Sequence, residues 1–230
     1  MGARARGLAS CVMTFEPHPK EFFTPAEAPP RILNLRDKLT AFADVGIDRV
    51  VIERFNAAYA KLTPEQFVSE ILIRRLNTKW ILIGDDFCYG AKRAGDFASL
   101  KRAGEEFGFE VSNINTVLEN QERISSSALR SALAEGDMPK AALLLGRPYM
   151  ISGHVIYGRQ IGRTLGFPTL NLAVANHLHE RKPAMTGIFT VLVHGLGDTP
   201  LPGVASLGVR PTVEDCLLYT SDAADEEDSV

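Results

Sequence analysis

Short apolar runs alternate with amphipathic segments through the first half of the chain, and this alternation constrains the fold more than any other feature. Four runs have the length and apolar character of strands, at residues 10–15, 49–55, 79–84 and 109–114. Three segments have helical spacing, at residues 33–46, 63–77 and 96–108. Strands that alternate with helices form a parallel sheet with right-handed crossovers. We therefore predict an α/β domain whose sheet is covered on both faces.

The predicted helices have recognisable start and stop signals. Thr63 is placed to cap the second helix, with Pro64 at its first position and Gln66 closing a capping box. Asp96 is the expected cap of the third helix, and Gly46 is the expected end of the first. The apolar stripes are Leu35, Leu39 and Phe42 in the first helix, and Phe67, Ile71 and Leu72 in the second.

The pattern changes after residues 146–149, which we interpret as a linker. The following strand-like runs, at 150–158, 187–195 and 201–209, are separated by Gly and Pro turns without a helical segment between them. This part of the chain is predicted to form a small antiparallel barrel or sandwich.

Composition and charge argue against several classes of protein. The chain has 230 residues and a net charge of -3, so nothing global points to nucleic acid or to an acidic membrane surface. No run approaches the roughly 20 apolar residues of a membrane span, and the start lacks a secretory pattern. Three scattered cysteines favour a reducing cytoplasm and argue against a zinc site. The segment after Cys216 is acidic, with five acidic residues and no basic one.

Ligands of parallel sheets bind beyond the carboxyl ends of the strands, and three stretches are expected there. The first, "RISSSALRSAL", begins a helix that Ser125 or Ser126 is expected to cap. A helix N-terminus also presents free N–H groups that suit phosphate, and Arg130 lies about one turn further on. Capping and phosphate binding are compatible, so both interpretations stay open.

The other two stretches are "EPHPKEFF" and "GDDFCYGAKRAGD". Two prolines stiffen the loop around His18, which fits either a binding imidazole or a solvent-facing one. Phe87 and Tyr89 suit a slot for a planar ring, although aromatic residues after a strand more often join the core. Asp85 and Asp86 have no evident third ligand and are not expected to bind a metal ion.

The stretch "GRTLGFPTLNL", residues 162–172, combines a permissive backbone with a hydroxyl and an amide. Its glycines and the one just before it permit close approach to a ligand; they are Gly158, Gly162 and Gly166. Arg163 adds charge, while Thr169 and Asn171 offer oxygen ligands that suit Mg²⁺ when substrate phosphates complete its shell. A glycine-rich barrel corner is the alternative. The "HLHE" at 177–180 lacks the spacing that places two imidazoles on one helical face.

Six segments resemble, in order, those of bacterial bifunctional riboflavin kinase/FAD synthetases: "VMTFEPHPKEFF", "GDDFCYG", "RISSSALR", "LLGRPY", "GHVIYGRQIGRTLGFPTLNL" and "SLGVRPTV". The resemblance implies a nucleotidyltransferase-type, Rossmann-like FMN adenylyltransferase domain at 1–146. It implies a partial riboflavin kinase barrel at 147–214, followed by a non-family acidic tail at 215–230. The implied activities are ATP-dependent phosphorylation of riboflavin to FMN and adenylylation of FMN to FAD.

The resemblance also implies the residues of two sites. ATP and its phosphates would be bound by Ser126, Ser127, Arg130, Gly158, Gly162, Arg163, Gly166, Thr169 and Asn171. The flavin would be bound by Pro17, His18, Asp86 and Phe87. Thr169 and Asn171 match the pair that the family uses on Mg²⁺. Flavins and ATP are therefore the implied partners, without nucleic acid or membrane.

Two parts that the resemblance implies are missing. Family members begin with a strand and a His-x-x-His type nucleotide loop before the segment that matches Met1, whereas the first histidine here is His18. The catalytic glutamate of the kinase would follow Glu214, where the sequence departs from the family. We therefore expect a chain truncated at both ends, which makes no measurable FAD.

Two other functions stay open. A non-catalytic flavin- or nucleotide-binding module would bind FMN tightly without turnover. An adenylyltransferase for another small molecule, joined to an unrelated barrel, would show no response to flavins.

Overall fold

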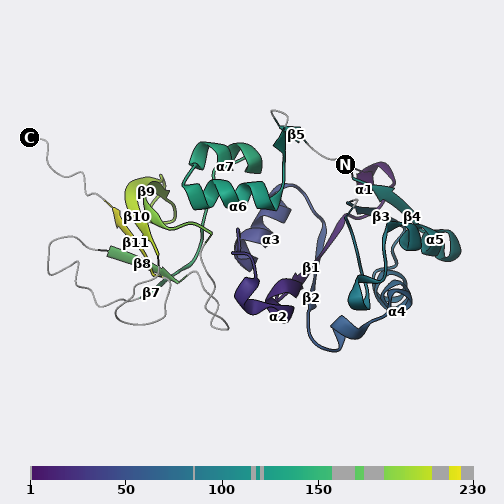
Figure 1. The fold of residues 1–230 in the computed structure, drawn as a ribbon. Coiled ribbons are helices and arrows are strands. Elements are labelled where there is room, and N and C mark those ends of the chain that lie inside the picture. Colours follow the sequence, from purple (N-terminus) through teal and green to yellow (C-terminus); the bar gives the residue numbers. More distant parts are fainter. Residues whose placement is uncertain are drawn as a thin grey trace, which may run out of the picture. The chain divides into compact units, whose positions relative to one another are not determined.

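The computed structural model describes residues 2–84, 86–114, 118–119, 122–156, 169–173, 184–208 and 218–223. The chain divides into two compact units (Figure 1). Unit 1 consists of Met1–Pro29 and Phe42–Gln121, and unit 2 of Pro30–Ala41 and Glu122–Val230. The chain therefore passes from one unit to the other three times.

Unit 1 alternates strands and helices, so the α/β class predicted from the sequence is confirmed. Its strands are β1 (Cys11–Glu16), β2 (Arg49–Arg54), β3 (Trp80–Ile83), β4 (Glu110–Asn113) and the short β5 (Leu118–Glu119). Its helices are α1 (Gly2–Ala5), α2 (Pro19–Phe23), α4 (Pro64–Gln66), the π-helix η3 (Phe67–Arg75) and α5 (Phe97–Phe107). Three 3-10 turns are η1 (Pro25–Glu27), η2 (Tyr59–Lys61) and η4 (Ala91–Arg93). Helix α3 (Leu35–Asp44) contributes residues to both units.

Strands β1 to β4 of unit 1 form two parallel pairs. β1 pairs with β2, from Cys11 opposite Arg49 to Glu16 opposite Arg54. β3 pairs with β4, from Trp80 opposite Glu110 onward. The sequence predicted one sheet, but among the described residues these pairs are separate two-stranded sheets. The parallel direction is thus confirmed, while the single continuous sheet is not observed.

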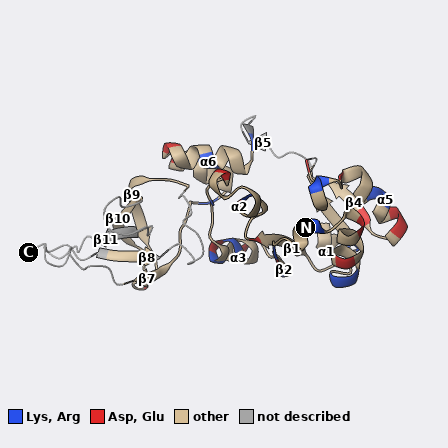
Figure 2. Ribbon diagram, turned by 60° about the horizontal axis from the view of Figure 1, so that its bottom comes forward, with Lys and Arg blue, Asp and Glu red and all other residues tan. Residues whose placement is uncertain are grey.

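Local capping follows the predicted pattern. The Gln66 N–H donates to the Thr63 hydroxyl at 3.2 Å, and the Thr63 N–H donates to the Gln66 side-chain oxygen at 3.0 Å. The Ser99 N–H donates to the Asp96 carboxylate at 2.8 Å, so Asp96 caps α5. Basic and acidic residues both lie along α5 (Figure 2).

The core of unit 1 consists of Phe67, Val68, Ile71, Leu72, Ile83, Tyr89, Leu100 and Phe109.

The second predicted helix differs from the expected geometry in its second part. After α4 it continues as a π-helix, in which the Leu76 N–H donates to the Ile71 carbonyl at 3.0 Å, five residues back. The apolar stripe is nevertheless buried as predicted, because Phe67, Ile71 and Leu72 all belong to the core.

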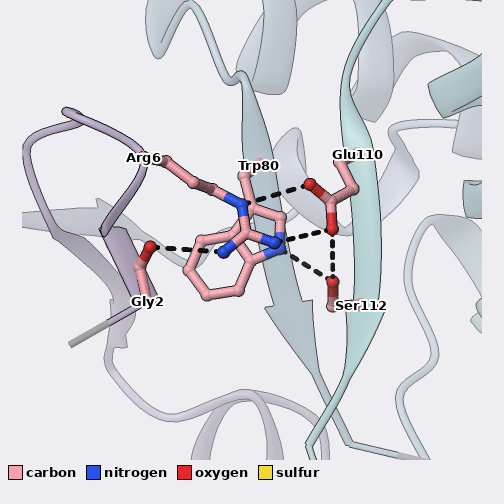
Figure 3. A network of polar contacts seen from close by, with 5 residues as sticks. All are labelled: Gly2, Arg6, Trp80, Glu110 and Ser112. Atoms are coloured by element: carbon pink, nitrogen blue, oxygen red, sulfur yellow. Dashed lines mark hydrogen bonds and ion pairs between the residues drawn. The ribbon is translucent and has the colours of Figure 1, made fainter. Parts of the chain in front are cut away.

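Arg6, which directly follows α1, contacts residues of β3 and β4 through its side chain (Figure 3). Its guanidinium lies 4.3 Å from the centroid of the Trp80 ring and donates to both carboxylate oxygens of Glu110, at 3.1 and 2.8 Å. The Trp80 indole N–H donates to the Ser112 hydroxyl at 2.8 Å, and Ser112 donates to Glu110 at 3.0 Å. The Glu110 carboxylate therefore accepts three hydrogen bonds from two residues.

Unit 2 combines two helices with an antiparallel sheet. The helices are α6 (Ser126–Glu135) and α7 (Met138–Leu145). The strands are β6 (Glu122–Arg123), β7 (His154–Ile156), β8 (Thr169–Ala173), β9 (Gly187–Val193), β10 (Leu201–Leu207) and β11 (Leu218–Ala223). Five of them form a sheet in the order β7-β8-β11-β10-β9, which is open in the part of the chain that is described. Antiparallel pairing is confirmed, whereas closure into a barrel is not observed.

Strand β11 lies within residues 215–230, which the resemblance implied to be a non-family tail. It pairs with β8 on one side and with β10 on the other. The expected domain boundaries at residues 146 and 214 stay a prediction.

Helices α6 and α7 pack on one face of the β9–β10 part of the sheet. The core of unit 2 consists of Leu129, Ala132, Leu133, Ala141, Leu144, Ala184, Met185, Ala205 and Leu207. Residues Ala205 and Leu207 alternate with the exposed Val204 and Ser206, as expected for a strand with one buried face.

Residues 30–41, which we name the strap, belong to unit 2 although residues of unit 1 precede and follow them. Asp37 in the strap is 5% exposed, and its carboxylate accepts hydrogen bonds from the Ser152 hydroxyl and from the Ser152 N–H at 3.1 Å. The Asn34 amide donates to the Ser152 carbonyl at 2.8 Å. The Tyr149 hydroxyl donates to the Ile32 carbonyl at 2.7 Å. The strap is therefore fixed to the segment that leads into β7.

Candidate functional site

The N-terminus of α6 carries the first predicted phosphate site. Ser125 is the cap residue, and its hydroxyl accepts from the Ala128 N–H at 3.1 Å. Ser126 and Ser127 occupy the first two helical positions, and both are exposed. The first N–H groups of a helix lack partners within the helix. Because Ser125 caps the helix, Ser126 and Ser127 remain at a surface that suits an anion. Helix capping and phosphate binding, the two interpretations of this stretch, are therefore compatible.

Arg130 lies one turn into α6 and is partly used within unit 2. Its Nε donates to the Pro30 carbonyl at 2.8 Å, and its Nη1 donates to the Ser126 carbonyl at 3.2 Å. Partial burial lowers the pKa of the guanidinium from its ordinary value, although an arginine remains charged at neutral pH. The sequence did not predict the bond to Pro30, because its partner is 100 residues away.

Pro17 and His18 lie at the turn between β1 and α2, where a cis peptide bond precedes Pro17. His18 is exposed and caps α2: its Nδ1 accepts from the Lys20 N–H at 3.2 Å, while its own N–H donates to Glu21 at 2.9 Å. The structure therefore gives His18 a capping role, close to the solvent-facing interpretation of the sequence.

An aromatic cluster beside this turn was not predicted. The ring of Phe55, just after β2, lies 5.7 Å from Phe15, 5.5 Å from Phe22 and 5.6 Å from Phe23. Tyr59 completes the cluster at 5.5 Å from Phe15. Phe22 and Phe23 are exposed despite their size. The sequence "EPHPKEFF" could have indicated this cluster, since it places two aromatic residues directly after the proline turn.

The loop after β3 carries Asp86 and Phe87. Asp86 is exposed, whereas Phe87 is half-buried and packs against the core of unit 1. Its ring is stacked with that of Tyr89 at 5.7 Å and an interplanar angle of 21°. Tyr89 itself is 7% exposed, so it follows the core alternative stated for the two aromatic residues. Asp85 lies outside the described residues.

Thr169 and Asn171 lie two residues apart in strand β8. Asn171 is 8% exposed and lies between Ile156 of β7 and Thr220 of β11 in the register. The other predicted phosphate-binding residues lie outside the described residues, as does the stretch 177–180; they are Gly158, Gly162, Arg163 and Gly166.

In the described ranges, no three His, Cys, Asp or Glu side chains gather in a way that could hold a metal ion. None of the helices in those ranges is both long and apolar enough to span a membrane.

Comparison with protein families gives two matches. The family model described as FAD synthetase matches residues 1–128, and the one described as riboflavin kinase matches residues 145–223. The second match ends inside the segment expected to be a tail.

Curated relatives match nearly the whole chain. A bifunctional riboflavin kinase/FMN adenylyltransferase of Escherichia coli K12 is 45% identical over 210 residues, which cover 91% of this chain and 66% of the relative. Proteins of the same name from Pseudomonas fluorescens and Haemophilus influenzae are 43% and 39% identical, each over 90% of this chain and 65% and 66% of the relative. The chain thus spans a little under two thirds of the length of these relatives.

One solved structure is similar over 99% of this chain and 73% of its own, with a TM-score of 0.73 and 26% identity. It is named a macrolide-efflux protein from Streptococcus pneumoniae. The sequence relatives, with their higher identity, agree with both family models. The chain therefore belongs to the family of bifunctional riboflavin kinases/FMN adenylyltransferases.

Proposed function

We propose that the chain comes from an enzyme that phosphorylates riboflavin to FMN and adenylylates FMN to FAD, with ATP as co-substrate in both reactions. The observation that carries this proposal is the 45% identity, over 91% of the chain, to a relative named for both activities. The part within 1–146 would be the adenylyltransferase domain of Rossmann-like nucleotidyltransferase type. The part within 147–214 would be a riboflavin kinase barrel.

In the adenylyl transfer, a phosphate oxygen of FMN attacks the α-phosphorus of ATP, and pyrophosphate leaves. Negative charge builds on the departing phosphates, so the protein contributes mainly by positioning groups and by stabilising this charge. Ser126 and Ser127 would donate to those phosphates from the first turn of α6, where their N–H groups also lack acceptors within the helix. Arg130 would contribute through Nη2, which has no hydrogen bond to another described residue.

The flavin of this reaction would lie against Pro17, His18, Asp86 and Phe87. The exposed rings of Phe22 and Phe23 support this placement, because they extend the apolar surface beside the proline turn. Aromatic rings stack favourably on a planar ligand such as isoalloxazine.

In the kinase part, Thr169 and Asn171 would hold Mg²⁺ together with the ATP phosphates. A threonine hydroxyl and an asparagine amide are neutral oxygen ligands of the kind Mg²⁺ accepts, both residues belong to β8, and Asn171 is nearly buried, so these residue types fit the ion. A bound Mg²⁺ would neutralise charge on the phosphate oxygens. Gly158, Gly162, Arg163 and Gly166 would complete the nucleotide site. A cytoplasmic location suits the free thiols of Cys11 and Cys88.

A non-catalytic binding module is the second candidate. One observation favours it: Arg130 uses two of its donor groups on backbone carbonyls, which leaves only part of the guanidinium for phosphate.

Incubation of the purified chain with Mg²⁺ and ATP, together with riboflavin or FMN, tests the proposal by chromatography of the flavins. Formation of FMN or FAD would support it directly. Calorimetric FMN binding without product would favour the binding module, and absence of any response to either flavin would refute both.

A variant pair tests the phosphate site separately. Ser126→Ala with Ser127→Ala should weaken ATP binding several-fold, because two hydroxyl donors are lost. Ser131→Ala is the matched control, since Ser131 is also exposed on α6 but lies beyond the first turn. Equal effects of both changes would remove the N-terminus of α6 from the proposed site.

A further inference from the structure

The loop that follows β3 closes on itself at residues 89–95, which we name the basic loop. Tyr89 and Gly95 exchange two backbone hydrogen bonds, at 3.0 and 2.9 Å. The Ala91 N–H donates to the Leu62 carbonyl at 2.7 Å, which ties the tip to the segment before α4. Gly90 approaches Pro64 so closely that a Cβ at Gly90 would lie 2.7 Å from the Pro64 nitrogen. The backbone of the loop is therefore anchored at three places.

The tip of this loop presents two adjacent cations in an unusual conformation. Lys92 and Arg93 have φ values of 56° and 58°, in the left-handed region that favours glycine. Both residues are exposed, and neither side chain forms a hydrogen bond or an ion pair with another described residue. Stability alone would favour Gly or Asn at these positions, so the two basic side chains are unexplained by the fold.

Nearby acidic groups do not account for the two cations. The Asp96 carboxylate, which follows the loop, is used to cap α5: backbone and side-chain hydrogen bonds from Ser99 hold the pKa of Asp96 below its ordinary value. Neither positive charge therefore has an acidic partner among the described residues, and both can meet a ligand.

Aromatic and cationic groups thus share one short segment. Phe87 is only half-buried, and its ring is stacked on that of Tyr89 at the base of the basic loop. A planar ring system that carries a phosphate matches this combination, because a phosphate monoester has a charge of about -1.5 to -2 at neutral pH. The guanidinium fork binds phosphate oxygens in pairs, and the ammonium group adds a point charge.

We infer that Lys92 and Arg93 bind the phosphate of FMN and so distinguish FMN from riboflavin in the adenylylation reaction. This inference rests on the proposed function. It gives a specificity role to two residues of the stretch "GDDFCYGAKRAGD" other than Asp86 and Phe87, which the resemblance assigned to the flavin. Riboflavin, which lacks the phosphate, gains nothing from the two cations.

Titration of flavin fluorescence with the full chain tests the inference. Lys92→Gln combined with Arg93→Gln should weaken FMN binding at least about tenfold, since two charge-assisted hydrogen bonds are lost. Riboflavin binding should change less than about twofold. Raising the salt concentration should weaken FMN binding to the unchanged chain more than to the variant, because salt screens exposed charges.

Lys101→Gln with Arg102→Gln provides the matched control. These residues form another adjacent, exposed Lys–Arg pair in unit 1, on α5, and their replacement changes the net charge equally. The control should leave FMN binding unchanged, and the fluorescence of Trp80 should report the same unfolding midpoint for both variants.

Three outcomes would overturn the inference. Equal losses of FMN and riboflavin binding would mean that the loop supports the flavin ring rather than the phosphate. Loss of ATP binding with unchanged FMN binding would assign the cations to the nucleotide. If the unchanged chain bound neither flavin, the proposed function would fail along with the inference, whereas the first two outcomes leave that function intact.

Discussion

The Tyr59 hydroxyl tests how much a buried polar group without a partner lowers the free energy of unfolding of unit 1. Its hydroxyl is buried and has no hydrogen-bond partner among the described residues, while its ring packs at 5.5 Å from Phe15 and 5.7 Å from Phe55. Burial, together with the charge of Glu53, raises the pKa of Tyr59 above its ordinary value. The phenol is therefore neutral at neutral pH, and no described residue accepts a hydrogen bond from it.

Tyr59→Phe should stabilise unit 1. A buried hydroxyl without a partner costs about 1 to 3 kcal/mol relative to a hydrated one. The substitution removes only the oxygen and keeps the ring contacts, so little packing is lost. We expect the free energy of unfolding to rise by about 1 kcal/mol or somewhat more.

Urea unfolding followed by tryptophan fluorescence measures this change, because Trp80 is the single tryptophan and lies in unit 1. Tyr89→Phe is the matched control with the opposite expected sign. The Tyr89 hydroxyl shares a hydrogen bond with Ser99 at 3.2 Å, so its removal should cost about 0.5 to 1.5 kcal/mol. A destabilised Tyr59→Phe variant would refute the reasoning, since it would show that the hydroxyl has a favourable partner in solution.

Two further predictions concern the core of unit 2 and the Arg6 network. Leu133→Ala should lower the free energy of unfolding by about 2 to 5 kcal/mol, because Leu133 is 0% exposed. Leu143, which is 49% exposed, is the control, and Leu143→Ala should change this free energy little. Urea unfolding followed by circular dichroism measures both changes. Hydrogen bonds from Arg6 and Ser112 lower the pKa of Glu110 below its ordinary value of 4.5. These hydrogen bonds therefore stabilise the fold fully above pH 4.5, and their stabilisation is lost as the pH falls below that value and Glu110 is protonated. Unfolding of the Arg6→Ala variant should depend less on pH in this range, and an unchanged pH profile would contradict the network's role.

The local structure of unit 1 was predictable because its signals are local. The capping box of Thr63 and Gln66 and the cap at Asp96 depend on residues three apart, and both were found as predicted. The burial of Phe67, Ile71 and Leu72 followed from their spacing. The π-helical form of Phe67–Arg75 has no such signal, since a wider turn buries nearly the same stripe.

The candidate sites were predictable as segments but less so as side-chain roles. Ser125 was one of two expected caps, and its use of the Ala128 N–H decided between them. His18 turned out to cap α2 because the proline at the next position starts a helix there. The left-handed conformation of Lys92 and Arg93 gave no sequence signal, since such positions are recognised from glycine or asparagine, and neither is present.

The burial of Asp37 in the strap could not be predicted from hydrophobic periodicity, because it depends on a long-range polar contact. Leu35, Leu39 and Phe42 predicted α3 correctly, but a helical stripe indicates only which side is buried and not against what. Asp37 lies off that stripe and would be expected in water, yet it is one of the most buried polar residues described. A buried carboxylate persists only where donors replace its lost hydration. Ser152 supplies two of them from 115 residues away, so the burial of Asp37 is decided by a contact that no local pattern encodes.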